Sequence, residues 1–271
     1  MNNKSWCSLG AFLRPTSGRW SGIARASALM GGVLAFYLFV GPTPACANDA
    51  PAWMHALVNV PLPEHDDKTD AVLLYSERIF TVQPNGKIKQ MKRAAYKILR
   101  VGGKEYGVVS ADFDADKKII AMHGWCIPAQ GKDYEVKEKD ALEGSVGIPG
   151  GELITDVRIK ILKIPAADVG NIVGYEVEQE LRPYILQHEW LFQQPVPTAE
   201  ARYTLQLPPG WEYKVAWINH AEVAPASVGN NQWQWVVKNV PAVKAEREMP
   251  PWRGVAGQMV LSMFPAGGSQ N

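Results

Sequence analysis

The amino-acid sequence predicts an all-β protein, namely a two-sheet antiparallel β-sandwich of the immunoglobulin-like kind. Short runs in which apolar and polar residues alternate follow one another from Asp70 onward, and this period of two is typical of strands that bury one face. Many of the 24 glycines and 20 prolines stand between those runs, as in folds built from many short strands. No segment repeats apolar residues at helical spacing over two turns.

The first two expected strands form a hairpin. The first begins near Asp70 and has apolar residues on both faces, with Val72, Leu74 and Phe80 sharing one parity. Pro84-Asn85-Gly86 then predicts a tight turn, because asparagine and glycine accept positive φ. On the return strand one face is apolar (Ile88, Ala94, Tyr96 and Ile98) and the other is basic (Lys87, Lys89, Arg93 and Lys97). This alternation predicts a sheet with one face open to water.

Further strands are expected from the same alternation. In chain order they are Lys118–Cys126, Tyr134–Val136, Thr155–Ile164, Ile172–Arg182, Glu189–Phe192, Ala201–Leu207, Tyr213–Asn219, Gln232–Val237 and Gln258–Phe264. The β-module therefore covers residues 70–264, with a short tail at 265–271. An irregular, proline-containing arm at 48–69 precedes it and offers Trp53, Met54 and Leu57 for docking onto the module.

Residues 1–47 have the features of a secretory signal peptide. Four basic residues and no acid precede an apolar run from Ala28 to Val40. Ala45-Cys46-Ala47 then offers small residues to a signal peptidase, so we expect cleavage after Ala47 and a periplasmic or extracellular location. An uncleaved membrane anchor is the alternative, although such a run would cross only about 20 Å of the roughly 30 Å hydrocarbon core.

Charge and cysteine content argue against several classes of protein. Loss of residues 1–47 would change the net charge from +1 to about −3, and such a balance creates no positive field for nucleic acid. Cys126 would then be the only cysteine. Because one cysteine cannot form an intramolecular disulfide, the apolar core must stabilise the fold.

The order of short motifs in the second half of the chain is more specific than its composition. The motifs are Thr155-Asp156-Val157-Arg158, Lys163-Ile164-Pro165, Tyr175-Glu176-Val177, Trp190-Leu191-Phe192-Gln193, Leu207-Pro208, Gly210-Trp211 and Asn239-Val240-Pro241. Over roughly residues 70–264 this order resembles the domain of unknown function 3857 family, the amino-terminal β-sandwich of bacterial transglutaminase-like proteins. The resemblance implies a module that usually precedes a papain-like domain, in which a histidine activates a cysteine thiol.

No residue of this chain is assigned a catalytic role, and we predict that it is not an enzyme. Cys126 is expected to be a buried apolar residue, with His123 on the opposite face of the same strand. Asp112, Asp114 and Asp116 have the spacing of a calcium loop. The following residues do not continue the calcium-loop pattern, so we expect a solvated acidic turn, with no metal and no cofactor.

Three other patterns also have structural interpretations. Glu176, Glu178 and Glu180 share one face of a strand and could perform acid–base chemistry if their repulsion raised a pKa, but a solvated face is the simpler interpretation. The five histidines lack the close spacings of a zinc site. The glycine-rich segment at 147–151 has no following lysine, so phosphate binding is not expected there.

Tryptophans crowd the last third of the chain and form the candidate ligand or partner surface. They are Trp211, Trp217, Trp233, Trp235 and Trp252. Core packing is the first interpretation of these rings. Exposed in a row, however, they would stack on sugars or contact a protein.

Two hypotheses of function follow. The first is a secreted, non-catalytic interaction or accessory module that works beside a separately encoded transglutaminase-like or peptidase protein, or forms the front part of a longer one. The second is a carbohydrate- or cell-wall-binding module that holds glycan with the tryptophans.

Overall fold

The computed structural model describes residues 49–145 and 156–267. Strands account for 51% and helices for 9% of these residues, which confirms the prediction of a mostly β protein. The expected signal peptide, the glycine-rich segment at 147–151 and the last part of the tail lie outside the described residues. Within them, no helix combines the length and the apolar character that crossing a bilayer requires.

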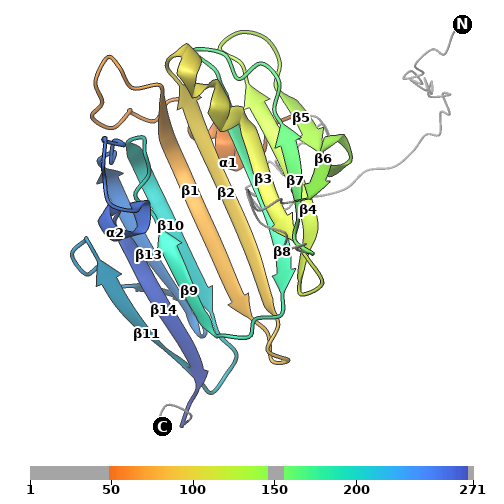
Figure 1. Ribbon diagram of the computed structural model, residues 1–271, viewed down its shortest axis with the longest axis vertical. Coiled ribbons are helices and arrows are strands. Elements are labelled where there is room, and N and C mark those ends of the chain that lie inside the picture. The colour runs from red at the N-terminus through yellow and green to blue at the C-terminus, as the bar shows by residue number, and fades with distance from the viewer. Residues whose placement is uncertain (1–48, 146–155, 268–271) are drawn as a thin grey trace, which may run out of the picture. The chain divides into compact units, whose positions relative to one another are not determined.

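Eight strands form one large sheet (Figure 1). Their order across the sheet is β12 (Ala226–Gly229), β13 (Gln232–Val240), β10 (Thr198–Gln206), β1 (Ala71–Val82), β2 (Ile88–Ile98), β8 (Ile172–Leu181), β4 (Lys117–Ile127) and β5 (Tyr134–Lys137). Neighbouring strands are antiparallel except β1 and β10, which run parallel.

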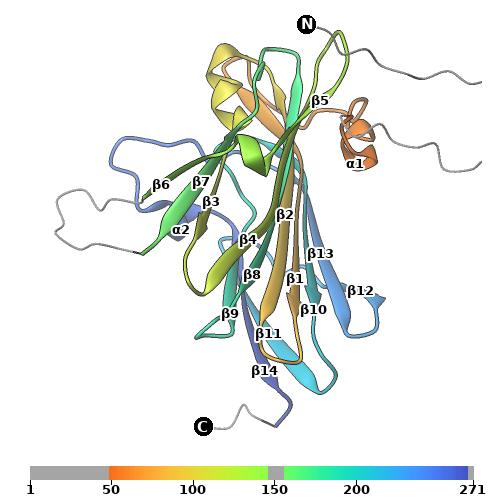
Figure 2. The same cartoon turned by 90° about the vertical axis from the view of Figure 1, so that its right-hand side faces the viewer.

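Two smaller sheets pack on one side of the large sheet, which we call its inner face (Figure 2). One has the order β3 (Val108–Phe113), β7 (Arg158–Lys163) and β6 (Leu142–Ser145), and the other has β11 (Trp211–Ile218), β14 (Gln258–Pro265) and β9 (Gln187–Leu191). Short helices complete the described elements: α1 (Ala52–His55), α2 (Trp252–Val255), and the 3₁₀ turns η1 (Val101–Gly107) and η2 (Glu138–Asp140).

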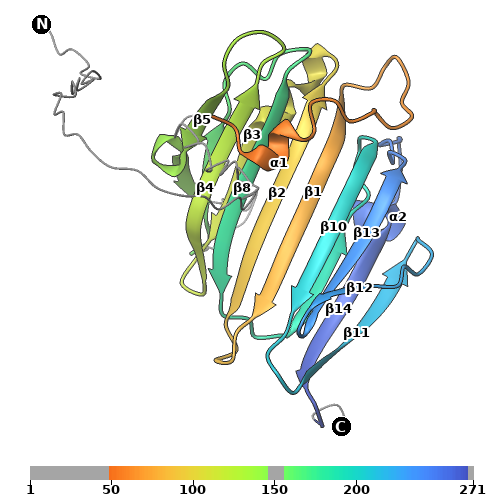
Figure 3. The same cartoon turned by 180° about the vertical axis from the view of Figure 1, so that it is seen from behind.

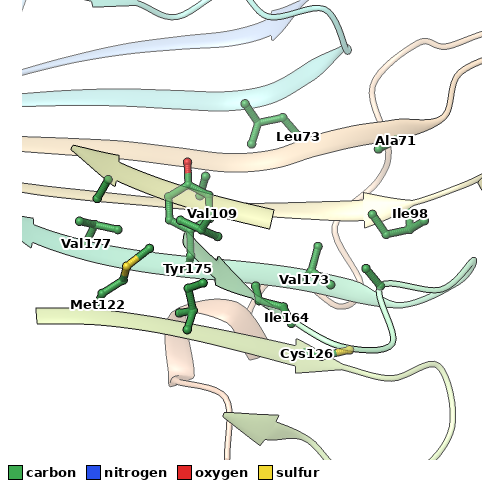
Figure 4. Packing of buried hydrophobic residues seen from close by; sticks show 14 of the residues in the cluster. Ala71, Leu73, Ile98, Val109, Met122, Cys126, Ile164, Val173, Tyr175 and Val177 are labelled. Carbon is green, nitrogen blue, oxygen red and sulfur yellow. The ribbon is translucent and has the colours of Figure 1, made fainter. Parts of the chain in front are cut away.

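The core consists of two apolar clusters on the inner face. Leu73, Met122 and Tyr175 of the large sheet pack against Val109 and Leu162 of the β3-β7-β6 sheet (Figure 4). The second cluster lies between the β11-β14-β9 sheet and β1, β10 and β13, and includes Phe80, Trp190, Tyr203, Trp235 and Leu261. Each large apolar side chain that is buried contributes about 1.5–3 kcal/mol, so these clusters hold the three sheets together.

The opposite side of the large sheet, its outer face, is covered at one end by the N-terminal arm (Figure 3). Met54 of α1 is fully buried there, in an apolar cluster with Val72, Leu74 and Ala95. Gly174 of β8 makes room for it, because a Cβ at this position would lie 2.7 Å from Met54 Sδ. The expected docking of the arm is thus confirmed.

The β1–β2 hairpin agrees with its sequence, apart from one shift. Gly86 has a φ of +78° and its N–H donates to the Gln83 carbonyl at 2.9 Å, as expected of a tight turn. A bulge between Leu73 and Tyr75 then changes the parity of β1. Leu74 therefore lies on the outer face and Phe80 on the inner face, whereas the sequence placed them together.

The arrangement of sheets differs from the predicted one. The described residues form three sheets with one parallel strand pair, whereas a two-sheet, wholly antiparallel sandwich was expected. Alternation predicts which face of a strand is buried but not which strand lies beside it, and β10 returns to β1 only after eight intervening strands. The sequence pattern also missed β3, β6 and β12, the last two of which are four-residue strands with few apolar side chains.

Candidate functional site

The five tryptophans do not form an exposed row. Trp235 is fully buried, and Trp211, Trp217 and Trp233 pack against the same core cluster between β13 and the β11-β14-β9 sheet. Trp252 begins α2 and is half-buried. Core packing is therefore confirmed for Trp235, and the other four present only part of their rings to solvent.

Cys126 and His123 lie on opposite faces of the large sheet. Cys126 is fully buried in the first core cluster (Figure 4), and burial raises the pKa of its thiol. His123 is on the outer face, where its Nδ1 lies 2.8 Å from a Glu135 carboxylate oxygen. A buried, protonated thiol whose neighbouring histidine points the other way is not an activated nucleophile.

The acidic patterns take structural roles. Asp114 accepts hydrogen bonds from the backbone N–H groups of Asp116 (2.7 Å) and Lys117 (2.8 Å), and Lys117 pairs with Asp112 at 2.8 Å. Glu176 and Glu180 lie on the outer face, where Glu180 pairs with Lys87 at 2.7 Å. Across residues 49–145 and 156–267, no group of three or more potential ligands could hold a metal ion.

A different site lies on the outer face, where the arm meets the large sheet. A cavity of about 540 Å³ opens between α1 and strands β1, β2, β10 and β13. Its apolar wall comes from the arm and its polar wall from the sheet; the lining includes Trp53, Leu57, Val60, Tyr75, Arg93, Glu200, Arg202 and Lys238. We call this cavity the outer groove.

Tyr75 is held between two arginines in the outer groove. The Arg93 and Arg202 guanidinium carbons lie 5.9 and 5.3 Å from the Tyr75 ring centroid, and Arg93 is also 5.2 Å from the Trp53 ring. These distances are within the range of cation–π attraction. Burial, together with the charge of Glu77, raises the pKa of Tyr75 to about 12. Its hydroxyl therefore stays protonated and can donate a hydrogen bond, but it does not act as a base.

Arg202 is placed by Glu200, with which it forms an ion pair, and Arg93 is placed by Glu77. The Glu77 side chain is 6% exposed, and its Oε2 accepts a 2.7 Å hydrogen bond from Arg93 Nε. Cross-strand partners continue the alternation of charge over four strands, in the order Arg202, Glu77, Arg93 and Glu176. Opposite charges on facing positions stabilise a sheet and fix side-chain positions, so the arginines are preorganised before any partner arrives.

The sequence did not identify this groove because its residues come from distant segments. Arg93 and Arg202 belong to strands on either side of β1, and Trp53 belongs to the arm. One signal was present: Glu77 and Arg78 interrupt the otherwise apolar first strand. A charged residue in such a strand requires a partner when it is buried, and Arg93 is that partner.

Comparison with protein families identifies the chain. Residues 84–244, more than half of the chain, match the family described as "Domain of Unknown Function with solved-structure structure (DUF3857)". The chain belongs to this family, which confirms the resemblance seen in the motifs. The matched range contains Arg93 and Arg202, whereas Trp53, Tyr75 and Glu77 precede it.

One solved structure shares the fold at low sequence identity. A candidate protease from Parabacteroides distasonis is 13% identical with a TM-score of 0.63, over 72% of this chain and 41% of that one. Two other structures are more distant. Leukotriene A4 hydrolase from Saccharomyces cerevisiae is 12% identical with a TM-score of 0.38, over 74% of this chain and 31% of that one. An M1 zinc metallopeptidase from Deinococcus radiodurans is 8% identical with a TM-score of 0.35, over 73% of this chain and 43% of that one. The chain spans about two fifths of the length of the Parabacteroides protein. No curated protein sequence matches it significantly.

Proposed function

We propose that this protein is a secreted, non-catalytic interaction module, active in the periplasm or outside the cell, that holds a transglutaminase-like or peptidase protein through the outer groove. The arginine-flanked Tyr75 beside Trp53 is the observation that carries the proposal. Tyrosine, tryptophan and arginine are the residue types that dominate binding energy at protein interfaces. Here they line an open groove with apolar and charged walls.

Two further observations support this function. The family resemblance implies an association with transglutaminase-like domains, and the Parabacteroides distasonis protein, named as a candidate protease, is more than twice as long as the part that this chain matches. A β-module that accompanies an enzyme needs a preorganised contact surface, and the ion pairs around Glu77 supply one. In the carbohydrate-binding alternative, glycan would have to bind the half-buried Trp211, Trp217, Trp233 or Trp252.

A binding experiment tests the interaction. The full chain is titrated calorimetrically with a papain-like, transglutaminase-like protein encoded by the same genome. We expect Arg202→Gln to weaken binding about 10- to 100-fold, as loss of a central arginine does at other interfaces. Lys89→Gln, an exposed residue on the outer face away from the groove, should bind as the parent chain does. Equal losses in both variants would rule out the outer groove as the contact surface.

An activity experiment tests the non-catalytic part separately. The full chain is incubated with peptide substrates for cleavage and for glutamine–lysine cross-linking, and no turnover is expected. Activity that disappears in Cys126→Ala would overturn the proposal.

A further inference from the structure

Two cations face each other on the inner face of the large sheet. Arg78 of β1 and Lys92 of β2 are direct cross-strand partners, and on this face Arg78 reaches His188 of β9. Lys92 is exposed, with its ammonium 5.7 Å from the Tyr175 ring centroid. Like charges at facing positions destabilise a sheet. No ion pair joins either cation to a carboxylate in the described part of the chain.

Arg78 is held on one side only. Its Nη1 lies 3.0 Å from His188 Nε2 and donates to the Glu189 carbonyl at 3.3 Å. Burial and the nearby Arg78 charge lower the pKa of His188 to about 3, so at neutral pH its Nε2 is an acceptor, and Nδ1 donates to the Tyr203 hydroxyl at 3.2 Å. The remaining donors of Arg78, Nε and Nη2, have no hydrogen-bond partner among the described residues.

A cavity of about 580 Å³ lies in front of Arg78. It is lined by Arg78, Ile185, Gln187, His188, Glu189, Leu191 and Arg253. At its rim, Arg253 pairs with the Glu189 carboxylate at 3.2 Å. Arg78 is thus the cation of this cavity that no described acid neutralises, and Lys92 on the neighbouring strand adds to its positive potential.

The same cavity follows the free edge of β9. In the described part of the chain β9 pairs only with β14. The Leu186 carbonyl accepts from Met263 N–H at 2.9 Å, on the β14 side. The backbone groups of successive residues in an antiparallel strand point to opposite sides, so the N–H and C=O groups of Gln187 and Glu189 point away from β14. The Glu189 carbonyl accordingly accepts a hydrogen bond from Arg78. Such an edge can pair with an additional extended strand.

We propose that this cavity binds an extended peptide segment that carries a carboxylate. The peptide backbone pairs with the free edge of β9, and its carboxylate accepts two hydrogen bonds from the Nε and Nη2 of Arg78, with Lys92 supplying further positive charge. A carboxylate on an extended peptide matches the site better than free phosphate, because the peptide can pair with the edge of β9 while its carboxylate accepts from Arg78. The proposal does not depend on the outer groove, which lies on the other face of the sheet.

Three fluorescently labelled hexapeptides of alternating valine and threonine, the first two blocked at both ends, test the proposal on the full chain by fluorescence anisotropy. One contains a central glutamate, one has glutamine in its place, and one combines the glutamine with a free carboxyl terminus. We expect either the glutamate peptide or the free-terminus peptide to bind. The one that binds shows whether the site recognises an acidic side chain or the carboxyl end of a chain. Equal affinity for all three, or tighter binding of inorganic phosphate used as competitor, would overturn the proposal.

Variants locate the binding. Arg78→Gln should weaken the preferred peptide about 10- to 100-fold, as loss of charge-assisted hydrogen bonds does. Lys92→Glu, at an exposed position, should weaken peptide binding at least tenfold. This variant keeps the proposal testable if Arg78→Gln does not fold. Lys89→Gln, on the same strand but on the outer face, should change nothing. Unchanged affinity in Lys92→Glu would contradict the assignment.

Discussion

Arg93 of β2 joins Glu77 of β1 in an ion pair that lies under the aromatic rings of the outer groove. The Glu77 side chain is 6% exposed and that of Arg93 is 22% exposed. Arg93 also reaches toward Glu176 of β8, with 3.9 Å between Nη1 and Oε2. One guanidinium therefore links three strands to the two rings, Trp53 and Tyr75, that line the groove.

Neutralising Glu77 should destabilise the fold. Removal of one partner of a buried ion pair typically costs about 3–5 kcal/mol. Arg93 remains partly solvated and keeps its contact with Glu176, so the cost should lie below that range. We expect Glu77→Gln to lower the free energy of unfolding by about 2 kcal/mol. Urea denaturation measures this. The control is Glu180→Gln, whose pair with Lys87 is more exposed and should matter much less; equal effects would show that burial of Glu77 is not what makes its pair important.

Tyr75 should make stability fall in alkaline solution. Its pKa is raised from 10 to about 12 by burial and by Glu77. A raised pKa stabilises the neutral phenol in the folded state, so this contribution is complete below pH 10 and is lost as the pH rises to 12. For this one group the slope is about 1.4 kcal/mol per pH unit. Unfolding of Tyr75→Phe between pH 9 and 12 should depend less on pH than unfolding of the parent chain, and an identical slope would contradict the prediction.

His188 should make the stability of the fold decrease in acidic solution. Its pKa is lowered from 6.5 to about 3 by burial, by Arg78 and by Lys117. Below pH 6.5 the unfolded chain binds a proton at this residue that the folded chain does not. Stability should therefore fall from pH 6.5 to 3, by about 1.4 kcal/mol per unit for this group. Urea midpoints of His188→Gln over this range should change less than those of the parent, and a parallel profile would be inconsistent with a neutral, buried His188.

The thiol of Cys126 should react only after unfolding. It is fully buried and its pKa is raised by burial, so the reactive thiolate is scarce and shielded. In a chain with Cys7→Ser and Cys46→Ser, a chromogenic thiol reagent should modify Cys126 slowly in buffer and rapidly in urea. Rapid modification of the folded chain would show an accessible thiol and reopen a catalytic role.

Gly174→Ala should loosen the arm. The added methyl would lie 2.7 Å from Met54 Sδ and 3.1 Å from the Ala94 carbonyl oxygen. Overpacking of this kind costs about 1–3 kcal/mol, and displacement of α1 should expose the arm to proteolysis. Gly254→Ala is the control, because its added Cβ meets nothing within 4 Å. If both variants resist protease as the parent does, α1 tolerates the methyl.

The strands were largely predictable because their pattern is local. The Pro84-Asn85-Gly86 turn and the apolar face of β2 follow from neighbouring residues alone. Lys92 interrupts that apolar face. This interruption was the feature of the sequence that could have predicted a cation on the inner face. The outer groove could not be predicted, since it needs β10 beside β1 and the arm across both.

The amino-acid sequence was enough to predict a mostly β module, its family, and the burial of Cys126 away from His123, because alternation and motif order lie along the chain. Three relationships required the folded structure: β1 and β10 are parallel neighbours, a bulge between Leu73 and Tyr75 turns Phe80 inward, and Arg78 faces Lys92 with no ion-paired acid among the described residues. These relationships depend on strand order and register. Both are set by long-range packing, which a period-two pattern does not encode.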